Sequence, residues 1–344
     1  MKTIHFVYAL PNLANKFQAR IQKSSQKFLH RQTIHGQIGE YKWPTPLSSP
    51  FSITYNVGSF FEKKFRLCLY DLRERIKIVP GDGDILLGHV WPDKKSLMWE
   101  ALENPRFAKR YLIGPYNNDS SQVGWMHEAL KQADNFFGIT GDYWIEHLAT
   151  SSLNEFKEKF VHLNMAVDVT SYPTVKKNFN PPGSRRFLYI GRHGRFGDEK
   201  GIGLLEELAA KIPGFKGGYI CSGGEIKGWE KISEPTKLTF QFMQKLALDY
   251  DIFINMSRAD AQATTIIEAM SWGFPVACTR ESGYSKDEGL YYLSLEDMPW
   301  NIELIGKIQS MPVDDLRRIA DINRAVVEEK YNWGSFLSRM EKYF

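Results

Sequence analysis

Apolar residues recur with two different spacings along the chain, and these spacings predict alternating strands and helices. In the second half, short apolar runs rich in β-branched and aromatic residues predict strands at 187–191, 217–224, 251–257, 274–279 and 290–294. Apolar positions three or four residues apart predict helices at 200–212, 244–250 and 262–272. Strands that alternate with helices over short connections predict a parallel sheet covered on both faces.

The first half repeats this pattern less regularly. Strands are predicted at 2–10, 84–91, 109–116 and 135–141, and helices at 69–78, 96–103 and 125–133. Residues 162–186 are polar and contain three prolines, which predicts a connection between two domains. We therefore expect one domain from 1–168 with 330–344, and a second from 169–329. Two α/β domains predict a ligand cleft at the carboxyl ends of their strands.

Composition excludes several classes of protein. The chain has 344 residues, of which 43% are hydrophobic and 24% charged, as in a globular protein. A net charge of +4 is too small to indicate nucleic-acid binding. No apolar run is long enough to span a bilayer, and the start has no signal-peptide cleavage site. Three widely spaced cysteines favour a reducing compartment, so we expect a cytoplasmic protein.

One basic segment leaves two interpretations open. Residues 16–31, KFQARIQKSSQKFLHR, place four apolar side chains among five cations. The segment is either a solvated helix face or a surface that meets an anionic membrane or an acidic acceptor. Peripheral membrane contact through residues 16–31 is therefore one expectation.

The stretch DAQATTIIEAMSWGFPV (260–276) carries the most informative pattern. A helix is predicted from Gln262 to Trp272, and small residues at its start leave room for a phosphate near the unpaired amides of 263–265. Asp260 and Glu268 are the acids of this stretch. Asp260 could alternatively be a helix N-cap, and Glu268 a solvated helix residue.

A second cluster lies in GRHGRFGDEKG (191–201), directly after a predicted strand. Arg192 and Lys200 bracket this glycine-bearing loop, which in a parallel sheet lies at the same carboxyl edge as Asp260. Two cations beside a helix N-terminus predict a diphosphate site. The loop has neither the spacing of a P-loop nor that of a dinucleotide-binding motif.

Together these motifs resemble those of retaining glycosyltransferases of the GT-B fold, family 4. That family has Glu, seven residues, then Glu-Ala-Met before Gly-x-Pro-Val, and here Asp260 and Glu268-Ala-Met precede Gly273-Phe-Pro-Val. The family's Gly-Arg and Lys-Gly pairs match 191–192 and 200–201. The resemblance implies two Rossmann-like domains with parallel sheets facing a central cleft, and a C-terminal helix that crosses back to the first domain.

The resemblance also implies roles for single residues. Glu268 would bind the ribose hydroxyls, Arg192 and Lys200 the diphosphate, and Asp260 the donor sugar. His89 follows the strand 84–88 and would contact the donor sugar, although a hydrogen-bonded histidine at a strand end is the plainer interpretation. The wider set expected to line the nucleotide sugar is Gly191, Gly223, Ala261, Gln262, Ala263, Thr264 and Thr265. Asp260 replaces the family's Glu, and its side chain, shorter by one methylene, predicts a different sugar or a different seating of it.

The implied reaction moves a hexose from a nucleotide diphosphate sugar, of the GDP-mannose or UDP-glucose type, to a glycan acceptor on a lipid or protein. It would retain the anomeric configuration and need no metal or other cofactor. Residues 82–84, DGD, precede a strand and are predicted to form a turn rather than a metal-binding Asp-x-Asp motif. The alternatives are a sugar-nucleotide epimerase, a phosphorylase-like enzyme and a non-catalytic nucleotide-sugar-binding protein.

Overall fold

The chain forms two compact α/β units, which we describe from a computed structural model. The described residues are 2–11, 37–44, 47, 50–74, 77–117, 120–194 and 198–344. The basic segment 16–31 lies outside them. Unit 1 comprises Met1–Gly138, Leu148–His162 and Met340–Phe344, and unit 2 comprises Ile139–His147 and Leu163–Arg339.

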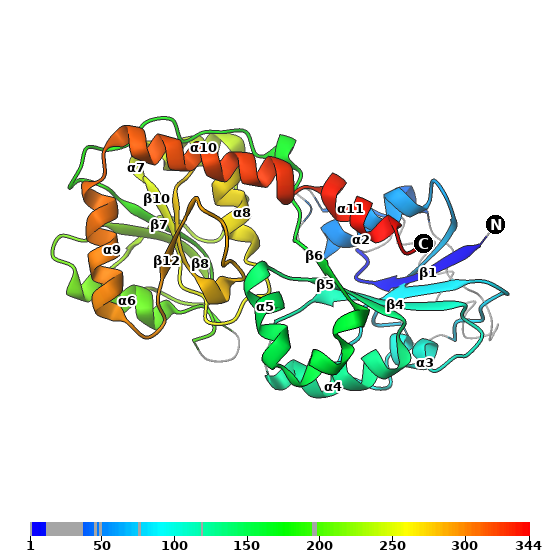
Figure 1. The fold of residues 1–344 in the computed structure, drawn as a ribbon. Coiled ribbons are helices and arrows are strands. Elements are labelled where there is room, and N and C mark those ends of the chain that lie inside the picture. Colours follow the sequence, from blue (N-terminus) through cyan, green and yellow to red (C-terminus); the bar gives the residue numbers. More distant parts are fainter. Residues whose placement is uncertain are drawn as a thin grey trace. The chain divides into compact units, whose positions relative to one another are not determined.

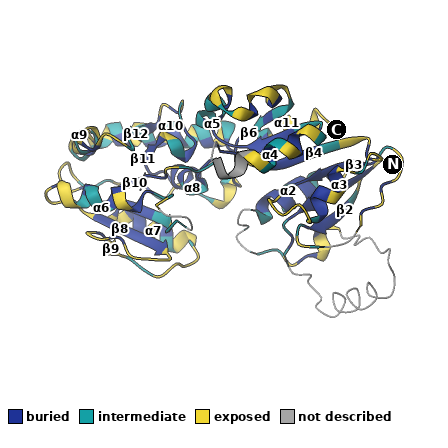
Figure 2. Cartoon of the chain, turned by 90° about the horizontal axis from the view of Figure 1, so that it is seen from below, coloured by how far each residue is buried: buried dark blue, intermediate teal, exposed yellow. Residues whose placement is uncertain are grey.

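Unit 1 is built on a six-stranded parallel sheet with the order β2-β1-β3-β4-β5-β6. Its strands are β1 (Thr3–Tyr8), β2 (Arg66–Asp71), β3 (Ile85–Gly88), β4 (Lys109–Pro115), β5 (Asn135–Ile139) and β6 (Phe160–Leu163). Its helices are η1 (Ile38–Glu40), α2 (Phe51–Phe61), α3 (Leu97–Leu102), α4 (Ser120–Gln132), η2 (Leu148–Thr150) and η3 (Ser152–Lys159). Figure 2 shows the strands buried and the outward faces of the helices exposed.

One predicted helix of unit 1 is wrong. Residues 69–78 were expected to be helical, but β2 occupies Arg66–Asp71 and pairs in parallel with β1, with Cys68 opposite His5. Cys68 to Asp71 are all buried in this pairing. A short apolar run that is buried on every side fits a strand and a helix equally well by spacing alone, which explains the error.

The aspartates of 82–84 form a turn, as predicted. Asp84 accepts hydrogen bonds from the Thr3 amide at 3.1 Å and shares one with His5 Nε2 at 2.9 Å. These partners fix the start of the sheet, so the carboxylate of Asp84 has a structural role in unit 1.

The last residues of the chain pack into the core of unit 1. The ring of Phe344 lies 4.2 Å from that of Phe61 and 5.0 Å from that of Tyr111, measured between centroids. The Tyr111 hydroxyl donates to the carbonyl of Tyr343 at 2.6 Å. The expected return of the C-terminus to the first unit is thus confirmed for residues 340–344.

Unit 2 is built on a second six-stranded parallel sheet with the order β12-β11-β10-β7-β8-β9. Its strands are β7 (Phe187–Arg192), β8 (Gly217–Ser222), β9 (Glu230–Lys231), β10 (Ile252–Asn255), β11 (Val276–Thr279) and β12 (Leu290–Leu293). Its helices are α5 (Asp142–His147), η4 (Val169–Ser171), α6 (Ile202–Lys211), α7 (Phe240–Asp249), α8 (Thr264–Ser271), η5 (Arg280–Ser282), α9 (Met298–Ser310), α10 (Val313–Lys330) and α11 (Trp333–Glu341). In Figure 1 the strands run between α10 above and α6 below.

The boundaries between the units differ from the predicted ones. Residues 139–147, 163–168 and 330–339 were assigned to the first domain but belong to unit 2. Backbone contacts explain this, because the Gly141 amide donates to the Ala261 carbonyl at 2.8 Å and the Val167 amide to the Tyr331 carbonyl at 3.0 Å.

A buried ion pair fastens the connecting segment to unit 2. Lys176 Nζ lies 2.9 Å from Asp251 Oδ1, and both side chains are 0% exposed. Asp251 also accepts from the amides of Asn180 and Arg186 at 2.8 and 3.0 Å. Burial alone would raise the pKa of Asp251, but Lys176 and these donors together hold it below its usual value. The pair therefore fixes the entry of the chain into β7.

Candidate functional site

The predicted site residues of unit 2 lie at the end of β7, on the loops that follow β7, β8 and β10, and on α8. Gly191 and Arg192 end β7, and Lys200 stands two residues before α6. Gly201, the N-cap of α6, has a φ of +65°, and a Cβ there would lie 1.9 Å from the carbonyl oxygen of Met256. Only glycine fits this position, so the backbone itself places Lys200 beside the loop after β10.

Lys200 and Asp260 form an ion pair between their Nζ and Oδ2 atoms. Their side chains are 13% and 26% exposed, so the pair is largely shielded from water yet reachable. A backbone bond from the Arg258 amide to the Glu199 carbonyl, at 2.9 Å, joins the same two loops. The structure thus brings together two residues that are 60 positions apart in the chain.

Arg192 is the more exposed cation of the site. Its side chain is 47% exposed, and its Nη2 lies 3.8 Å from Glu199 Oε1. The Tyr189 hydroxyl donates to the Arg192 carbonyl at 3.1 Å. Burial raises the pKa of Tyr189 most, and the charge of Asp260 adds to that rise while Arg192 opposes it.

The start of α8 differs from the prediction. The helix begins at Thr264, with Ala263 as its N-cap, so the N-cap interpretation of Asp260 is wrong. The Ala263 amide donates to the Ser282 carbonyl at 2.9 Å, and the Ile266 amide to the Ala263 carbonyl at 3.1 Å. Within the described ranges, the amides of Thr264 and Thr265 have no acceptor. Because Ala263 is already paired, the amide site that can receive an anion is narrower than predicted.

Glu268 lies in the middle of α8 and is half-buried. It borders a space of about 10 Å³ whose other lining residues include Leu188, Ile190 and Phe253. Burial raises the pKa of Glu268 to about 7, and a hydrogen bond from the Tyr172 hydroxyl at 3.3 Å opposes that rise. Its partial burial beside this apolar space disfavours the solvated-helix interpretation.

Ala261 and Gln262 stabilise the loop after β10 through hydrogen bonds to other segments of unit 2. Gln262 Oε1 accepts from the Met165 amide at 2.6 Å, and its Nε2 donates to Asn164 Oδ1 at 3.3 Å. The Ala261 carbonyl accepts from the Gly141 amide at 2.8 Å. Both polar groups of the Gln262 side chain are therefore bonded to the protein, so a ligand would contact the Gln262 backbone.

Residues 139–147 brace this loop and were not recognised from the sequence. A Cβ on Gly141 would lie 1.5 Å from the Gly283 carbonyl oxygen, and a Cβ on Gly283 would lie 2.5 Å from the Ala261 oxygen. Trp144 Nε1 donates to the Asp260 carbonyl at 2.6 Å. Three backbone segments thus touch without side chains between them, and they hold Asp260 in place. The Gly141-Asp142 pair, at the end of the predicted strand 135–141, was the sequence feature that could have indicated this contact.

Gly223 lies after β8 and has a φ of +93°. The neighbouring loop contacts it through His193, whose amide donates to the Ser222 carbonyl at 2.8 Å. The His193 ring shares a hydrogen bond with the Glu225 carbonyl at 3.0 Å. His193 therefore ties the loops after β7 and β8 together, a role that its sequence context did not reveal.

His89 is the predicted site residue that lies in unit 1. It follows β3, and its Nδ1 lies 3.2 Å from the Ile113 carbonyl oxygen, so Nδ1 carries the proton. Burial lowers the pKa of His89 to about 4, with that hydrogen bond opposing the fall. The imidazole is neutral at pH 7, and its Nε2 is an acceptor.

Neither a metal-ligand cluster nor a membrane-spanning helix is found in the described part of the chain. No group of three or more His, Cys, Asp or Glu side chains there could hold a metal ion. None of the helices described is both long and apolar enough to cross a membrane.

Known proteins resemble the chain in structure but not in sequence. No protein family matches it by sequence, and no curated protein does. Its structure is similar to sucrose-phosphate synthase from Thermosynechococcus elongatus, with a TM-score of 0.62, 13% identity and coverage of 99% of this chain and 98% of that one. It is also similar to the lipopolysaccharide outer core galactosyltransferase WaaB, with a TM-score of 0.59, 12% identity and coverage of 99% and 100%.

A third similar structure is that of TarM, with a TM-score of 0.57 and 16% identity. The match covers 75% of this chain and 54% of TarM, so the chain spans about half of that protein. At these identities the likeness concerns the fold. The α/β class with two six-stranded parallel sheets is confirmed, and the chain has the GT-B fold of its glycosyltransferase neighbours.

Proposed function

We propose that the protein is a retaining, metal-independent glycosyltransferase that moves a hexose from a nucleotide diphosphate sugar to a glycan acceptor. The GT-B fold supports the reaction class, since the structures it resembles include a galactosyltransferase. The donor is of the GDP-mannose or UDP-glucose type, and the acceptor glycan is carried by a lipid or a protein.

One observation carries the proposal: Lys200 is paired with Asp260, four and five residues before Thr264 and Thr265, whose amides have no acceptor among the described residues. These groups offer a cation and two N–H donors to an anion at the start of α8. Arg192, near the same loops, supplies a second positive charge. This combination suits a diphosphate, whose two phosphates need more positive charge than one amide pair provides.

The same groups explain how the reaction would be accelerated. As the bond between the sugar C1 and the diphosphate oxygen breaks, its electron pair goes to the departing phosphate. Lys200, Arg192 and the α8 amides stabilise that growing charge more than they stabilise the intact donor. The acceptor hydroxyl forms the new bond to C1 on the same face, and its proton passes to the departing phosphate oxygen.

Asp260 and Glu268 would hold the rest of the donor. The Asp260 carboxylate accepts hydroxyl protons of the sugar once a phosphate takes over part of its interaction with Lys200. Glu268 accepts the ribose hydroxyls, for which it must be ionised. The neutral His89 contributes an acceptor nitrogen toward the donor sugar.

A thermal-shift panel of UDP-, GDP-, ADP- and dTDP-sugars tests the donor site. A ligand that binds the native state raises its melting temperature by mass action. We expect one nucleotide family to stabilise the wild type equally with and without EDTA, and to stabilise Glu268→Gln much less. Glu296→Gln, a change at an exposed position on another loop, is the matched control.

Other results would favour the rival functions. Absence of any shift would contradict a donor site at Glu268, and shifts that need a metal would contradict metal independence. Donor binding without release of nucleoside diphosphate in the presence of glycans would instead favour an epimerase or a non-catalytic binding protein.

A further inference from the structure

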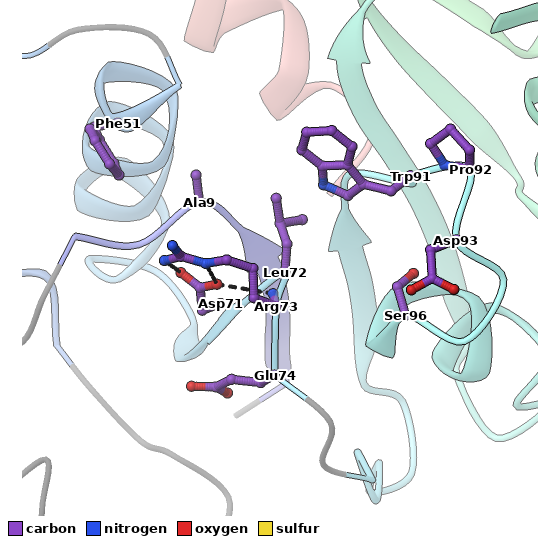
Figure 3. A pocket seen from close by; sticks show the side chains of 10 residues that line it. All are labelled: Ala9, Phe51, Asp71, Leu72, Arg73, Glu74, Trp91, Pro92, Asp93 and Ser96. Atoms are coloured by element: carbon purple, nitrogen blue, oxygen red, sulfur yellow. Dashed lines mark hydrogen bonds and ion pairs between the residues drawn. The ribbon is translucent and has the colours of Figure 1, made fainter.

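Unit 1 contains a cavity of about 620 Å³ that the donor site does not use. It lies at the carboxyl ends of β1, β2 and β3, bordered by the starts of α2 and α3 (Figure 3). Its lining residues are Ala9, Phe51, Asp71, Leu72, Arg73, Glu74, Trp91, Pro92, Asp93 and Ser96. A cavity of this size holds a small organic ligand such as a sugar ring.

Trp91 offers an aromatic surface to this cavity. Trp91 is 50% exposed, which is high for a tryptophan. The backbone beneath it is fixed, because Trp99 Nε1 donates to the Trp91 carbonyl at 2.7 Å. The ring of His89 packs edge-on at 5.6 Å between centroids. A fixed, exposed indole is a suitable platform for the apolar C–H face of a sugar.

Ser96 adds a polar group without a protein partner. It is the N-cap of α3 but makes no side-chain capping bond. Its hydroxyl oxygen is buried, and it has no hydrogen-bond partner among the residues described. Since a buried hydroxyl is unfavourable until it is paired, rotation of the Ser96 side chain toward a ligand hydroxyl in the cavity would give it a partner.

The charges of the lining favour a neutral ligand over an anion. Among the described lining residues, three acids, Asp71, Glu74 and Asp93, stand against one cation, Arg73, which gives these residues a net charge of −2. Arg73 is already paired, because its Nε and Nη2 donate to the two oxygens of Asp71 at 2.6 Å each. A phosphate would therefore be repelled, whereas sugar hydroxyls can donate to the carboxylates.

We propose that this cavity binds a neutral sugar ring, which stacks on Trp91 and places its hydroxyls against Asp93 and Ser96. Figure 3 shows Trp91, Asp93 and Ser96 on one side and Phe51, Asp71 and Arg73 on the other. The identification of this sugar as the acceptor rests on the proposed function, because the platform is two residues from His89. The binding site itself does not depend on it.

Saturation-transfer NMR tests the site in the absence of any nucleotide. The probes are the methyl glycosides of glucose, galactose, mannose and N-acetylglucosamine, with glucose 6-phosphate as the anionic comparison. We expect the wild type to saturate ring protons of at least one neutral glycoside and to bind the phosphate more weakly. Trp91→Ala should weaken glycoside binding by about tenfold, and Trp91→Phe by much less.

Trp300→Ala is the matched control, because Trp300 is a similarly exposed tryptophan, at 43%, that lies in unit 2. It should bind glycosides as the wild type does. Ser96→Ala should weaken binding by about threefold, and it keeps the proposal testable if Trp91→Ala does not fold by circular dichroism. Failure of every neutral glycoside to bind, equal binding by Trp91→Ala, or stronger binding of glucose 6-phosphate would overturn the proposal.

The variant Glu268→Gln distinguishes the sugar cavity of unit 1 from the proposed donor site of unit 2. Glu268→Gln should bind methyl glycosides normally even though it loses nucleotide sugars. If the wild type bound glycosides through Trp91 but no nucleotide sugar, the proposed function would fail and this site would stand. The reverse pattern would remove the sugar cavity and leave the donor site intact.

Discussion

The two units have sheets of the same size, but the candidate site of unit 2 is formed largely by backbone and that of unit 1 by side chains. In unit 2, glycines and backbone amides shape the site, and Lys200 and Asp260 complete it. In unit 1, the cavity depends on side chains such as Trp91 and Ser96. Phosphates can be bound by generic groups such as amides and cations, whereas a particular sugar has to be recognised by individual side chains.

The largest expected effect concerns the stability of unit 2. Lys176→Ala leaves Asp251 buried without its countercharge, which should lower the free energy of unfolding by about 3–5 kcal/mol. Urea unfolding followed separately by fluorescence and circular dichroism would show unit 2 losing its structure before unit 1. Lys307→Ala removes an exposed pair with Glu303 and should change stability by less than about 1 kcal/mol. Equal effects of the two variants would contradict a structural role for the buried pair.

The next effect tests the chemistry assigned to unit 2. Lys200→Ala should lower the rate of nucleoside diphosphate release by about two orders of magnitude, because one charge-stabilising donor is lost. Initial rates at saturating donor and acceptor measure this. Lys211→Ala removes an exposed lysine of α6 that pairs with Glu207, and it should keep the wild-type rate. A Lys200→Ala enzyme with full activity would exclude the proposed leaving-group role.

Glu268 should make unit 2 less stable as the pH rises. Its pKa is about 7 in the folded protein against a usual 4.5, so the folded state holds the proton longer than the unfolded state does. Stability should therefore fall from about pH 4.5 to 7 and then level off, by about 3 kcal/mol in all. Melting temperatures of wild type and Glu268→Gln across this range should diverge, with the variant more stable at pH 8. Parallel curves would show that the carboxyl is not desolvated.

His89 should give unit 1 the opposite dependence, of which only a small part falls between pH 7 and 6. Its pKa is about 4 in the folded protein against a usual 6.5, so the unfolded state binds the proton first as the pH falls. This stability is complete above about pH 6.5 and is lost as the pH falls toward 4, with less than about 1 kcal/mol lost between pH 7 and 6. His89→Asn should flatten the acid side of the unfolding profile. An unchanged profile would mean that His89 is solvated.

The sequence predicted the framework of unit 2 well and that of unit 1 less well. Strands β7, β8 and β10 and helix α6 lie within a few residues of their predicted positions, because turn residues and glycines bound each run. Helix α2 was not predicted, since FSITYNVGSFF mixes aromatic and β-branched residues that favour strands. For β2, burial on all sides removed the alternation that distinguishes a strand from a helix.

The candidate sites, too, were predicted from the sequence only in part. Spacing alone indicated that Lys200 and Asp260 share one edge of the sheet, and the structure places them in contact. The assigned roles of these residues stay predictions. Trp91 fell inside a predicted strand, and its exposure could not be foreseen because exposure depends on the neighbouring loops. The support from Trp144 and Gly141 joins segments more than 100 positions apart, which no local pattern records.

The contact of Gly141, Gly283 and the Ala261 carbonyl limits how this protein could be re-engineered. Exchanging the 260–263 loop for that of a glycosyltransferase with the same fold would fail if the incoming backbone lay even slightly closer to Gly141 or Gly283, because no side chain is there to move aside. A working chimera would have to transfer 139–147, 260–263 and 279–284 as one cassette. The smallest part of the protein that can be exchanged is therefore encoded by three separate segments of the gene. Directed evolution of the proposed donor preference should vary these three segments jointly.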